Sequence, residues 1–489
     1  MAVAPHFPHP DYTLMAPTWR KLRDVYAGRE ALLRGTTRYL PQPTNMDDER
    51  YQGYLTRPKW FGATRRTVQA FEGLAFRQPL SVAAPPKVEA QLETLTSTGV
   101  SLQSLARLIF RETLLMGRYG VLVDMDSVGQ RPFWAGYPAE QITNWTVGIV
   151  DGRRQLIHVE LVECDYVLGA DGHTQEPLET IRTLQLIDGI YTQTVELVTS
   201  AGTRQQVTQV VPQRQGGPLT FLPFVFFGVN DLEPQVELSP INDLADTNLS
   251  YWRHSADYEW SLHLTASPTP WVTGHDPSLD IGPNGEPLAE LVLGSDMAIF
   301  LKEPDAKIGM LEFQGHGLEP LRQAMLDDKA EMASLGARLL EGQPETNETL
   351  GAFRMRQAGD TSVIAALAQA LSAGLTRLLR MHAFWFGAAQ TAEDARIRCS
   401  LPTNFVAVKL EPQMLTALLA GVQSGHISQE TFYWNMQQGE MAEPGVDWEE
   451  EMARIEAQMP AMARLVTPNG TSNGTTPAPS NSSTNGVAA

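Results

Sequence analysis

Residues 239–264 read SPINDLADTNLSYWRHSADYEWSLHL, and residues 317–341 read GLEPLRQAMLDDKAEMASLGARLLE. Ser239 and Pro240 favour a helix start, because serine caps helix N-termini and proline is tolerated in the first turn. In the second stretch apolar residues recur every three or four positions, and Asp328 is the one polar residue of that stripe. The stripe consists of Leu318, Leu321, Met325, Met332, Leu335 and Leu339. Both stretches predict helices of about 25 residues, roughly 37 Å long at 1.5 Å per residue.

The chain between these helices, residues 266–315, contains proline and glycine throughout. Its strand-like pieces are Trp271–Thr273, Ala298–Leu301 and Met310–Phe313. Two long antiparallel helices that carry a small β-rich tip predict a projection and not a compact core. A polar loop then precedes a third long helix, predicted from Leu350 to Phe386 by the spacing of its leucines.

Residues 1–237 change from helical to strand periodicity along their length. Helices are predicted around residues 15–26, 47–56, 64–76 and 102–116, with Gly28 ending the first and Ser101 and Gly117 bounding the last. Strands are predicted at residues 119–125, 157–161, 191–198, 205–211 and 221–227. Downstream, the patterns predict a strand at 396–408, helix at 415–439, an acidic helix at 447–459 and a flexible uncharged tail at 466–489. The fold class is therefore α+β.

The composition is acidic, with 37 Lys and Arg against 56 Asp and Glu and a net charge of −19. This balance argues against a nucleic-acid reader built on a basic surface. The charge is segregated, because residues 1–120 carry +6 whereas residues 231–349 carry −16. A solvated acidic face is one explanation. Cys164 and Cys399 are predicted to be buried thiols of a reducing compartment. The longest apolar run, residues 222–229, is far shorter than the ~20 residues of a membrane helix, and no secretion signal opens the chain.

Catalytic motifs are not found in the sequence. It has no GxxxxGK[ST] loop, HExxH, CxxC or GxSxG. Asp124 and Asp126 follow a predicted strand and could hold a divalent cation, although such a pair more often marks a strand-to-turn boundary. We therefore expect no catalytic residue, cofactor or metal site, with a metal-dependent enzyme using Asp124 and Asp126 as an alternative.

Several blocks occur in a characteristic order. The first comprises Tyr12, Met15, Trp19, Arg23, Asp24, Tyr26, Gly28, Gly35 and residues 39–41. The second comprises Arg57, Phe61, Thr67, Gly73, Phe76 and Pro79. The later blocks are Leu114–Asp124, Pro223–Gly228, Ile241–Ala245, Ser255–Glu259, Pro268–Pro270 and Gly336–Leu340. Together they resemble one branch of the tailed-bacteriophage portal proteins (head-to-tail connectors), over about residues 10–410.

The resemblance implies a portal fold made of named parts. These are a mixed wing (1–237), two stem helices (238–265 and 316–341) with a small β-rich clip between them (266–315), a tunnel loop (342–349), a long helix returning to the wing (350–409), a helical crown (410–465) and a disordered tail (466–489). The implied function is a homododecameric ring at one capsid vertex, through which double-stranded DNA is packaged and ejected. The implied protein partners are the terminase large subunit, the major capsid or scaffolding protein and a head-completion adaptor. The protein would be in the virion, and in the host cytoplasm during assembly. Another virion or scaffold protein without a channel is an alternative.

The resemblance also assigns two sets of site residues. The tunnel loop, lining the DNA channel, contributes Glu341, Gln343, Glu345, Asn347 and Glu348. The clip, which docks partners, contributes Asp276, Asp280, Glu286 and Glu290. In a ring the acidic residues would repel DNA phosphates and favour sliding. The sequence leaves open whether they face the channel or the solvent.

Overall fold

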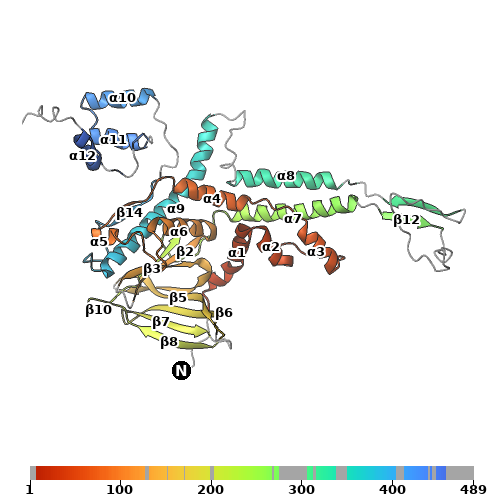
Figure 1. Ribbon diagram of the computed structural model, residues 1–489, viewed down its shortest axis with the longest axis horizontal. Coiled ribbons are helices and arrows are strands. Elements are labelled where there is room, and N and C mark those ends of the chain that lie inside the picture. The colour runs from red at the N-terminus through yellow and green to blue at the C-terminus, as the bar shows by residue number, and fades with distance from the viewer. Residues whose placement is uncertain are drawn as a thin grey trace, which may run out of the picture. The chain divides into compact units, whose positions relative to one another are not determined.

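The computed structural model describes residues 7–126, 131–150, 152–169, 171–198, 203–266, 269–274, 305–311, 315, 317–336, 350–403, 412–438, 441–442, 446 and 448–458. It divides into two compact units, residues 1–405 and 406–489. Helices and antiparallel sheets both contribute to the first unit, so the predicted α+β class is confirmed (Figure 1).

The N-terminal helices follow the local signals closely. They are α1 (Pro10–Ala27), α2 (Arg29–Gly35), η1 (Thr36–Arg38), α3 (Asp48–Thr56), α4 (Ala63–Ala75), α5 (Pro86–Glu89) and α6 (Leu102–Met116). The predicted cap of α6 is confirmed, because the Ser104 backbone N–H donates to Ser101 Oγ at 3.3 Å. Gly117 ends α6 in the left-handed conformation at φ +75°, and a Cβ there would lie 2.3 Å from the Glu237 carbonyl oxygen. Only glycine satisfies both conditions.

Two antiparallel sheets form the β part of this unit. The first has the order β11 (Phe224–Gly228), β2 (Arg118–Met125), β3 (Pro132–Pro138). The second is a meander of β4 (Ile142–Val150), β5 (Arg153–Leu168), β6 (Gln175–Ile187), β7 (Ile190–Val198) and β8 (Arg204–Val210). Small pairs join β1 (Ser81–Ala83) to β14 (Arg398–Ser400) and β9 (Gln213–Arg214) to β10 (Gly217–Pro218). The sequence missed β3, β4 and β6, and β5 extends well beyond the predicted residues 157–161.

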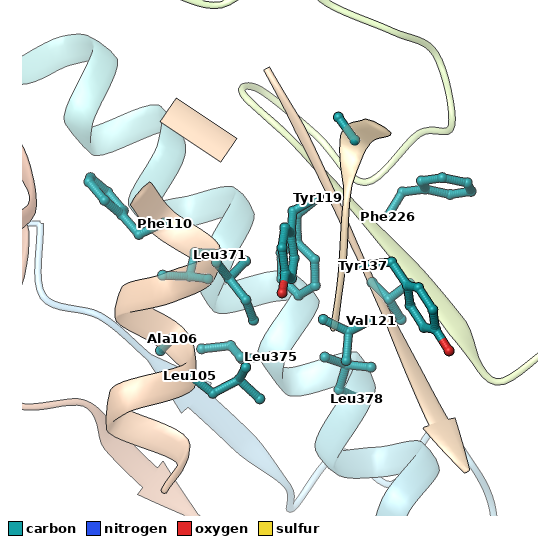
Figure 2. Close-up of a cluster of buried hydrophobic side chains, with 14 of the residues drawn as sticks. Leu105, Ala106, Phe110, Tyr119, Val121, Tyr137, Phe226, Leu371, Leu375 and Leu378 are labelled. Carbon is teal, nitrogen blue, oxygen red and sulfur yellow. The ribbon is translucent and has the colours of Figure 1, made fainter. Parts of the chain in front are cut away.

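The long helix that the leucine spacing predicts is confirmed as α9 (Leu350–Trp385), and most of its buried residues from Ile364 onward belong to the main buried cluster. Leu371 and Leu375 face Leu105 and Ala106 of α6, and Leu378 lies beside β2 (Figure 2). The segment Val363–Trp385 is long and apolar enough to cross a membrane by length and composition, but half of it is buried inside the protein. Its apolar residues belong to the main buried cluster, as those of a core helix do.

Two long helices follow the sheets, with differences from the prediction at their ends. These are α7 (Asn242–Thr265) and α8 (Leu318–Ser334). Ser239 is predicted to cap α7, but the helix begins three residues later, with Ile241 as its N-cap residue. The Ser239 hydroxyl accepts from the Ile241 N–H at 3.2 Å, in the turn before the helix, and donates to the Leu114 carbonyl at 2.9 Å. α8 ends before the predicted Glu341, because the chain turns at Leu335 and Gly336, where φ is +133°. Leu335, a member of the predicted apolar stripe, lies at this turn and is 38% exposed.

The second unit contains α10 (Pro412–Gln423), α11 (Gln429–Gln438) and α12 (Trp448–Gln458). The helix predicted over residues 415–439 is interrupted between α10 and α11, where Gly425 has φ +75°. The predicted acidic start of the last helix is confirmed, since Glu449, Glu450 and Glu451 occupy the first turn of α12. Residues 466–489 lie outside the described residues.

His382 of α9 is a fully buried histidine whose two ring nitrogens both have partners. Trp134 Nε1 donates to Nδ1 at 3.3 Å, and Nε2 lies 2.7 Å from the Gln91 Oε1 acceptor. The neutral ring with its proton on Nε2 satisfies both contacts. Burial, with a smaller contribution from Arg131, lowers the pKa of His382 to about 4.

We expect the buried His382 to weaken the fold at acid pH. An unfolded histidine has a pKa of about 6.5, so the unfolded chain binds the proton between pH 6.5 and 4, and stability falls as the pH decreases through this window. The loss should be about 2.5 kcal/mol by pH 4.5. Urea unfolding of the wild type and of His382→Gln at pH 7 and 4.5 checks this, because the variant should lose less stability on acidification. An identical pH dependence for both proteins would contradict the assignment.

The two cysteines differ in exposure, which corrects the prediction that both are buried. Cys399 is buried in β14, but Cys164 is exposed where β5 extends beyond β4. Burial raises the pKa of Cys399 to about 12. We expect a disulfide reagent at pH 8 to label Cys164 in the native protein, and Cys399 only after unfolding in guanidinium. The variant Cys164→Ser should abolish the native labelling, and rapid reaction of that variant would contradict the burial of Cys399.

Candidate functional site

The tunnel-loop and clip residues assigned by the resemblance lie outside the described residues. This holds for Glu341, Gln343, Glu345, Asn347 and Glu348, and for Asp276, Asp280, Glu286 and Glu290. The described part of the candidate site consists of the elements on both sides of them, which are α7, α8, the hairpin between these helices and α9.

Helices α7 and α8 lie side by side (Figure 1). Asp328, the predicted polar residue of the stripe, is only 8% exposed, and its Oδ2 lies 2.7 Å from His254 Nδ1 of α7. One turn further along α8, Met332 is buried in a cluster with Leu244 and Tyr251. A buried carboxylate needs its partner, so the His254–Asp328 contact fixes the register of the two helices.

A two-stranded hairpin lies between α7 and α8 in the chain. It pairs β12 (Thr269–Thr273) with β13 (Lys307–Leu311), which confirms the strand predicted at Trp271–Thr273. Of the strand predicted at Met310–Phe313, Met310 and Leu311 belong to β13, and the other two residues lie outside the described residues, as does the strand predicted at Ala298–Leu301. Trp271 is 41% exposed and stands opposite Gly309, whose absent side chain leaves room for the indole. Ile308, Met310 and Leu311 are exposed as well. An isolated hairpin with this much exposed apolar surface is a candidate contact surface.

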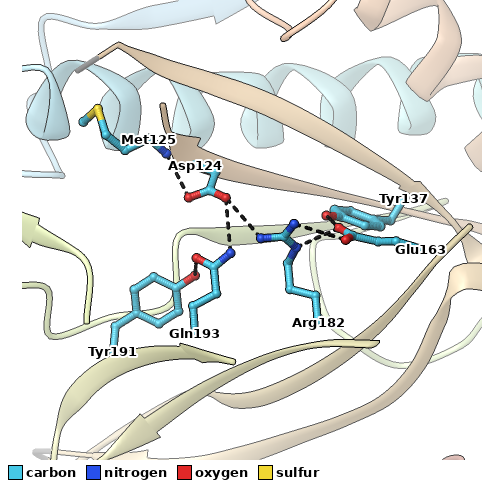
Figure 3. A network of polar contacts seen from close by, with 7 residues as sticks. All are labelled: Asp124, Met125, Tyr137, Glu163, Arg182, Tyr191 and Gln193. Carbon is cyan, nitrogen blue, oxygen red and sulfur yellow. Dashed lines mark hydrogen bonds and ion pairs between the residues drawn. The ribbon is translucent and has the colours of Figure 1, made fainter. Parts of the chain in front are cut away.

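Asp124, the carboxylate of the alternative enzyme hypothesis, belongs to a polar network that joins the two sheets (Figure 3). Its Oδ2 accepts from Gln193 Nε2 of β7 at 3.2 Å and from Arg182 Nη1 of β6 at 3.4 Å. Arg182 also donates to both oxygens of Glu163 of β5, at 2.7 and 3.1 Å. Tyr137 of β3 donates to Glu163 at 2.5 Å.

The electrostatics of this network are those of a structural ion pair. Burial would lower the pKa of Arg182, but its hydrogen bonds with Glu163 and the nearby negative charges outweigh burial and raise it. Burial, together with the charge of Glu163, raises the pKa of Tyr137 well above its ordinary value. No group of three His, Cys, Asp or Glu side chains suited to a metal occurs among the residues that the structure describes. The contacts of Asp124 therefore support a structural role for this carboxylate.

A basic pocket that the sequence did not indicate lies between α1 and α7. Its volume is about 480 Å³, and four of its eight lining residues are cationic, against one acidic residue. The cations are Arg20, Lys21, Arg38 and Arg253. The adjacent Arg20 and Lys21 are visible in the sequence, but only the tertiary fold brings Arg253 to them.

A second cavity of about 680 Å³ lies beside β4 and β11, with Trp145 and Phe226 in its lining. Arg118 is buried between these two rings, with its guanidinium carbon 3.8 Å from the centre of the Trp145 ring and 4.3 Å from that of Phe226. Burial lowers the pKa of Arg118 to about 9. Cation–π contact on both sides stabilises the charge in this position.

The family match concerns the segment from α7 to α9. A protein-family model described as "Domain of unknown function (DUF4055)" matches residues 240–386, which run from the start of α7 to the end of α9. No curated protein matches the chain.

Three solved structures are similar over most of the chain. "Neck of empty GTA particle computed with C6 symmetry" is 13% identical, covers 77% of this chain and 90% of that chain, and has a TM-score of 0.40. "Neck of native GTA particle computed with C12 symmetry" is 12% identical over 76% and 89%, with a TM-score of 0.37. "Virion of native gene transfer agent (GTA) particle" is 13% identical over 81% and 96%, with a TM-score of 0.38.

Proposed function

We propose that this chain is a portal-type subunit of a tailed-phage-like virion. Twelve copies would form a ring at one capsid vertex, which serves as the channel for packaging and ejection of double-stranded DNA. The terminase large subunit, the major capsid or scaffolding protein and a head-completion adaptor would be its protein partners. The proposed role is structural and requires no catalytic residue, cofactor or membrane.

The observation that carries the proposal is the order of elements from α7 to α9. A long helix, a β-hairpin, an antiparallel long helix and a third long helix that enters the core follow one another, in the order of stem, clip, stem and long helix implied by the sequence resemblance. The sequence blocks that carry the resemblance occur in the same order.

Exposed apolar side chains on these elements support an assembly. Leu264 of α7, Leu326 of α8 and the apolar residues of the hairpin are exposed in a single chain. Neighbouring subunits would cover them, and obligate interfaces commonly bury ~2,000–5,000 Å².

The charge distribution supports a passage for DNA and not a DNA-binding groove. Residues 231–349 carry −16 per chain. A ring concentrates the potential of such charges inside low-dielectric walls, where phosphates would be repelled from every side. This is the opposite of the basic groove that binds DNA by counterion release.

Negative-stain microscopy and sedimentation of the purified chain test the proposal. We expect rings with a central hole and a species many times the 53.9 kDa of one chain. A stable monomer at high protein concentration would contradict the proposal. Assemblies without an axial hole would favour a different virion or scaffold protein.

A double substitution tests the proposed acidic tunnel loop. Glu345→Lys with Glu348→Lys should leave ring assembly intact but slow translocation or leave heads partly filled, because each lysine can pair with a DNA phosphate. DNA length per capsid and packaging rate at two salt concentrations are the measurements, and higher salt should partly rescue packaging by screening. Normal filling at low salt would contradict the electrostatic role of this loop.

A further inference from the structure

We propose that the outer face of α8 in one copy of this chain docks on the basic pocket of the next copy. The α8 face carries Asp327 and Glu331, and the pocket carries Arg20, Lys21, Arg38 and Arg253. This docking rests on the proposed ring and specifies the surfaces by which adjacent subunits recognise each other.

The arginine side chains of the pocket are not fully paired with carboxylates of their own chain. Lys21 is paired, with its ammonium 2.7 Å from Asp246 Oδ1 and 3.0 Å from Asn242 Oδ1. Arg20, by contrast, makes no hydrogen bond or ion pair with another described residue. Arg38 reaches Asp24 only at 3.9 Å. Arg253 uses its Nε to donate to the Tyr39 carbonyl at 2.9 Å. Three exposed guanidinium groups therefore remain available to carboxylates, which they bind in a fork geometry.

The pocket and α8 lie on opposite sides of α7. Asp246, Leu249 and Arg253 of α7 line the pocket. Leu244, Tyr251 and His254 of the same helix contact α8. At 100° per residue the mean directions of these two sets differ by about 150°. Figure 1 agrees, with α8 on one side of α7 and α1 on the other.

The outer face of α8 carries the complementary charge. Asp328, Met332 and Met325 point toward the α7 side of the helix. Asp327 lies about 135° around the helix from the mean direction of these residues, and Glu331, one turn further along, lies about 95° from that direction on the same side. Both acids are exposed, and Asp327 accepts a hydrogen bond only from Gln323 of its own helix, at 2.8 Å, among the contacts of the described residues. Residues at i and i+4 have Cβ atoms about 5–6 Å apart, so two neighbouring arginine forks can reach both carboxylates.

A ring of identical subunits needs two complementary surfaces on opposite sides of each subunit. In a head-to-tail interface each copy uses two different surfaces, and the assembly closes when the rotation between copies closes. The apolar contacts proposed above would supply most of the affinity. The charged contact would set register and exclude wrong pairings.

Charge reversal on each surface tests the docking in the full-length chain. The pocket variant is Arg20→Glu with Arg38→Glu, and the face variant is Asp327→Lys with Glu331→Lys. Each alone should raise the protein concentration needed for half-maximal ring formation by at least about tenfold, because like charges then meet at every interface. Analytical ultracentrifugation measures this concentration, and circular dichroism checks that the fold is unchanged.

An equimolar mixture of the two variants gives the sharpest result. In an alternating ring the lysine face meets the glutamate pocket, and the wild-type face of the pocket variant meets the wild-type pocket of the face variant. The mixture should therefore form rings at nearly the wild-type concentration, and a non-specific loss of stability would not be rescued in this way. Reversing exposed charges elsewhere, with Arg34→Glu plus Arg66→Glu and with Asp165→Lys plus Glu176→Lys, should leave assembly unchanged.

The outcomes separate this docking from the proposed function. If the wild type forms rings and both variants assemble normally, or the mixture is not rescued, the docking is wrong while the proposed function stands. If the wild type forms no ring, the proposed function fails and the docking falls with it. If the pocket variant assembles normally but loses binding of inorganic phosphate or duplex DNA that the wild type shows, the pocket serves phosphates and the docking is wrong.

Discussion

Replacing Arg23 by methionine is expected to lower the free energy of unfolding by about 3–5 kcal/mol. The Arg23 guanidinium holds Glu112 of α6 with two hydrogen bonds of 2.9 and 2.8 Å and Glu140 of η2 (Ala139–Gln141) with two of 2.9 Å. Glu112 is buried, so removal of the arginine leaves a buried carboxylate without its cation. Burial would lower the pKa of Arg23, but its bonds to the two glutamates outweigh burial and raise it.

Two further variants make this prediction specific. Arg29→Met removes an exposed ion pair with Glu30 at 3.2 Å and should cost less than about 1 kcal/mol. Adding Glu112→Gln to Arg23→Met should recover part of the stability, because the buried charge disappears with its partner. Urea unfolding followed by circular dichroism gives all four free energies. A loss below about 1 kcal/mol for Arg23→Met would show that Glu112 finds water or another partner.

Truncation of Trp19 to alanine is expected to cost a similar amount, about 3–5 kcal/mol, through the cavity that it leaves. Trp19 of α1 is 0% exposed, its Nε1 donates to the Met116 carbonyl at 2.9 Å, and its ring meets Tyr12 edge-on with 5.6 Å between centroids. It thus ties α1 to the end of α6.

Trp19→Phe separates packing from hydrogen bonding at this position. Phenylalanine retains most of the apolar volume but leaves the Met116 carbonyl unpaired, so it should cost less than alanine, roughly 1–3 kcal/mol. The exposed Trp434 of α11 is the matched control, and Trp434→Ala should change stability by less than about 0.5 kcal/mol. Equal losses for Trp19→Ala and Trp434→Ala would contradict the burial of Trp19.

Local signals determined much of the helical structure. Asp47 caps α3, Ser101 caps α6, and Gly28 and Gly117 end their helices, each by a bond or a backbone angle within a few residues. The leucine spacing of α9 predicts a long helix over Leu350–Phe386, close to its observed bounds. Such features are legible in a sequence because both partners of each interaction are close along the chain.

The sequence-based predictions were wrong where a contact with residues distant in the chain decides the local structure. Ser239 has the chemistry of an N-cap, but its hydroxyl donates to the distant Leu114 carbonyl and accepts from the N–H of Ile241, which precedes the first residue of α7. The sequence of β6 does not have a strand-like pattern, because it contains Pro177 and several charged residues. It forms a strand because β5 and β7 pair with it on both sides. A free cysteine is usually buried, so Cys164 is predicted to be buried. It is exposed because it lies in the part of β5 that extends beyond the end of the neighbouring strand β4.

For the candidate site, too, some features follow from the sequence and others only from the tertiary structure. The sequence by itself determined the two long helices, the polar position at Asp328 and the segregation of acidic charge into residues 231–349. Only the tertiary structure decided that Asp124 is held by Arg182 and Gln193, and that Arg253 joins Arg20 and Arg38 in one pocket. The physical reason is that periodicity and capping depend on neighbours in the chain, whereas the partner of a charge depends on which elements the buried core brings together.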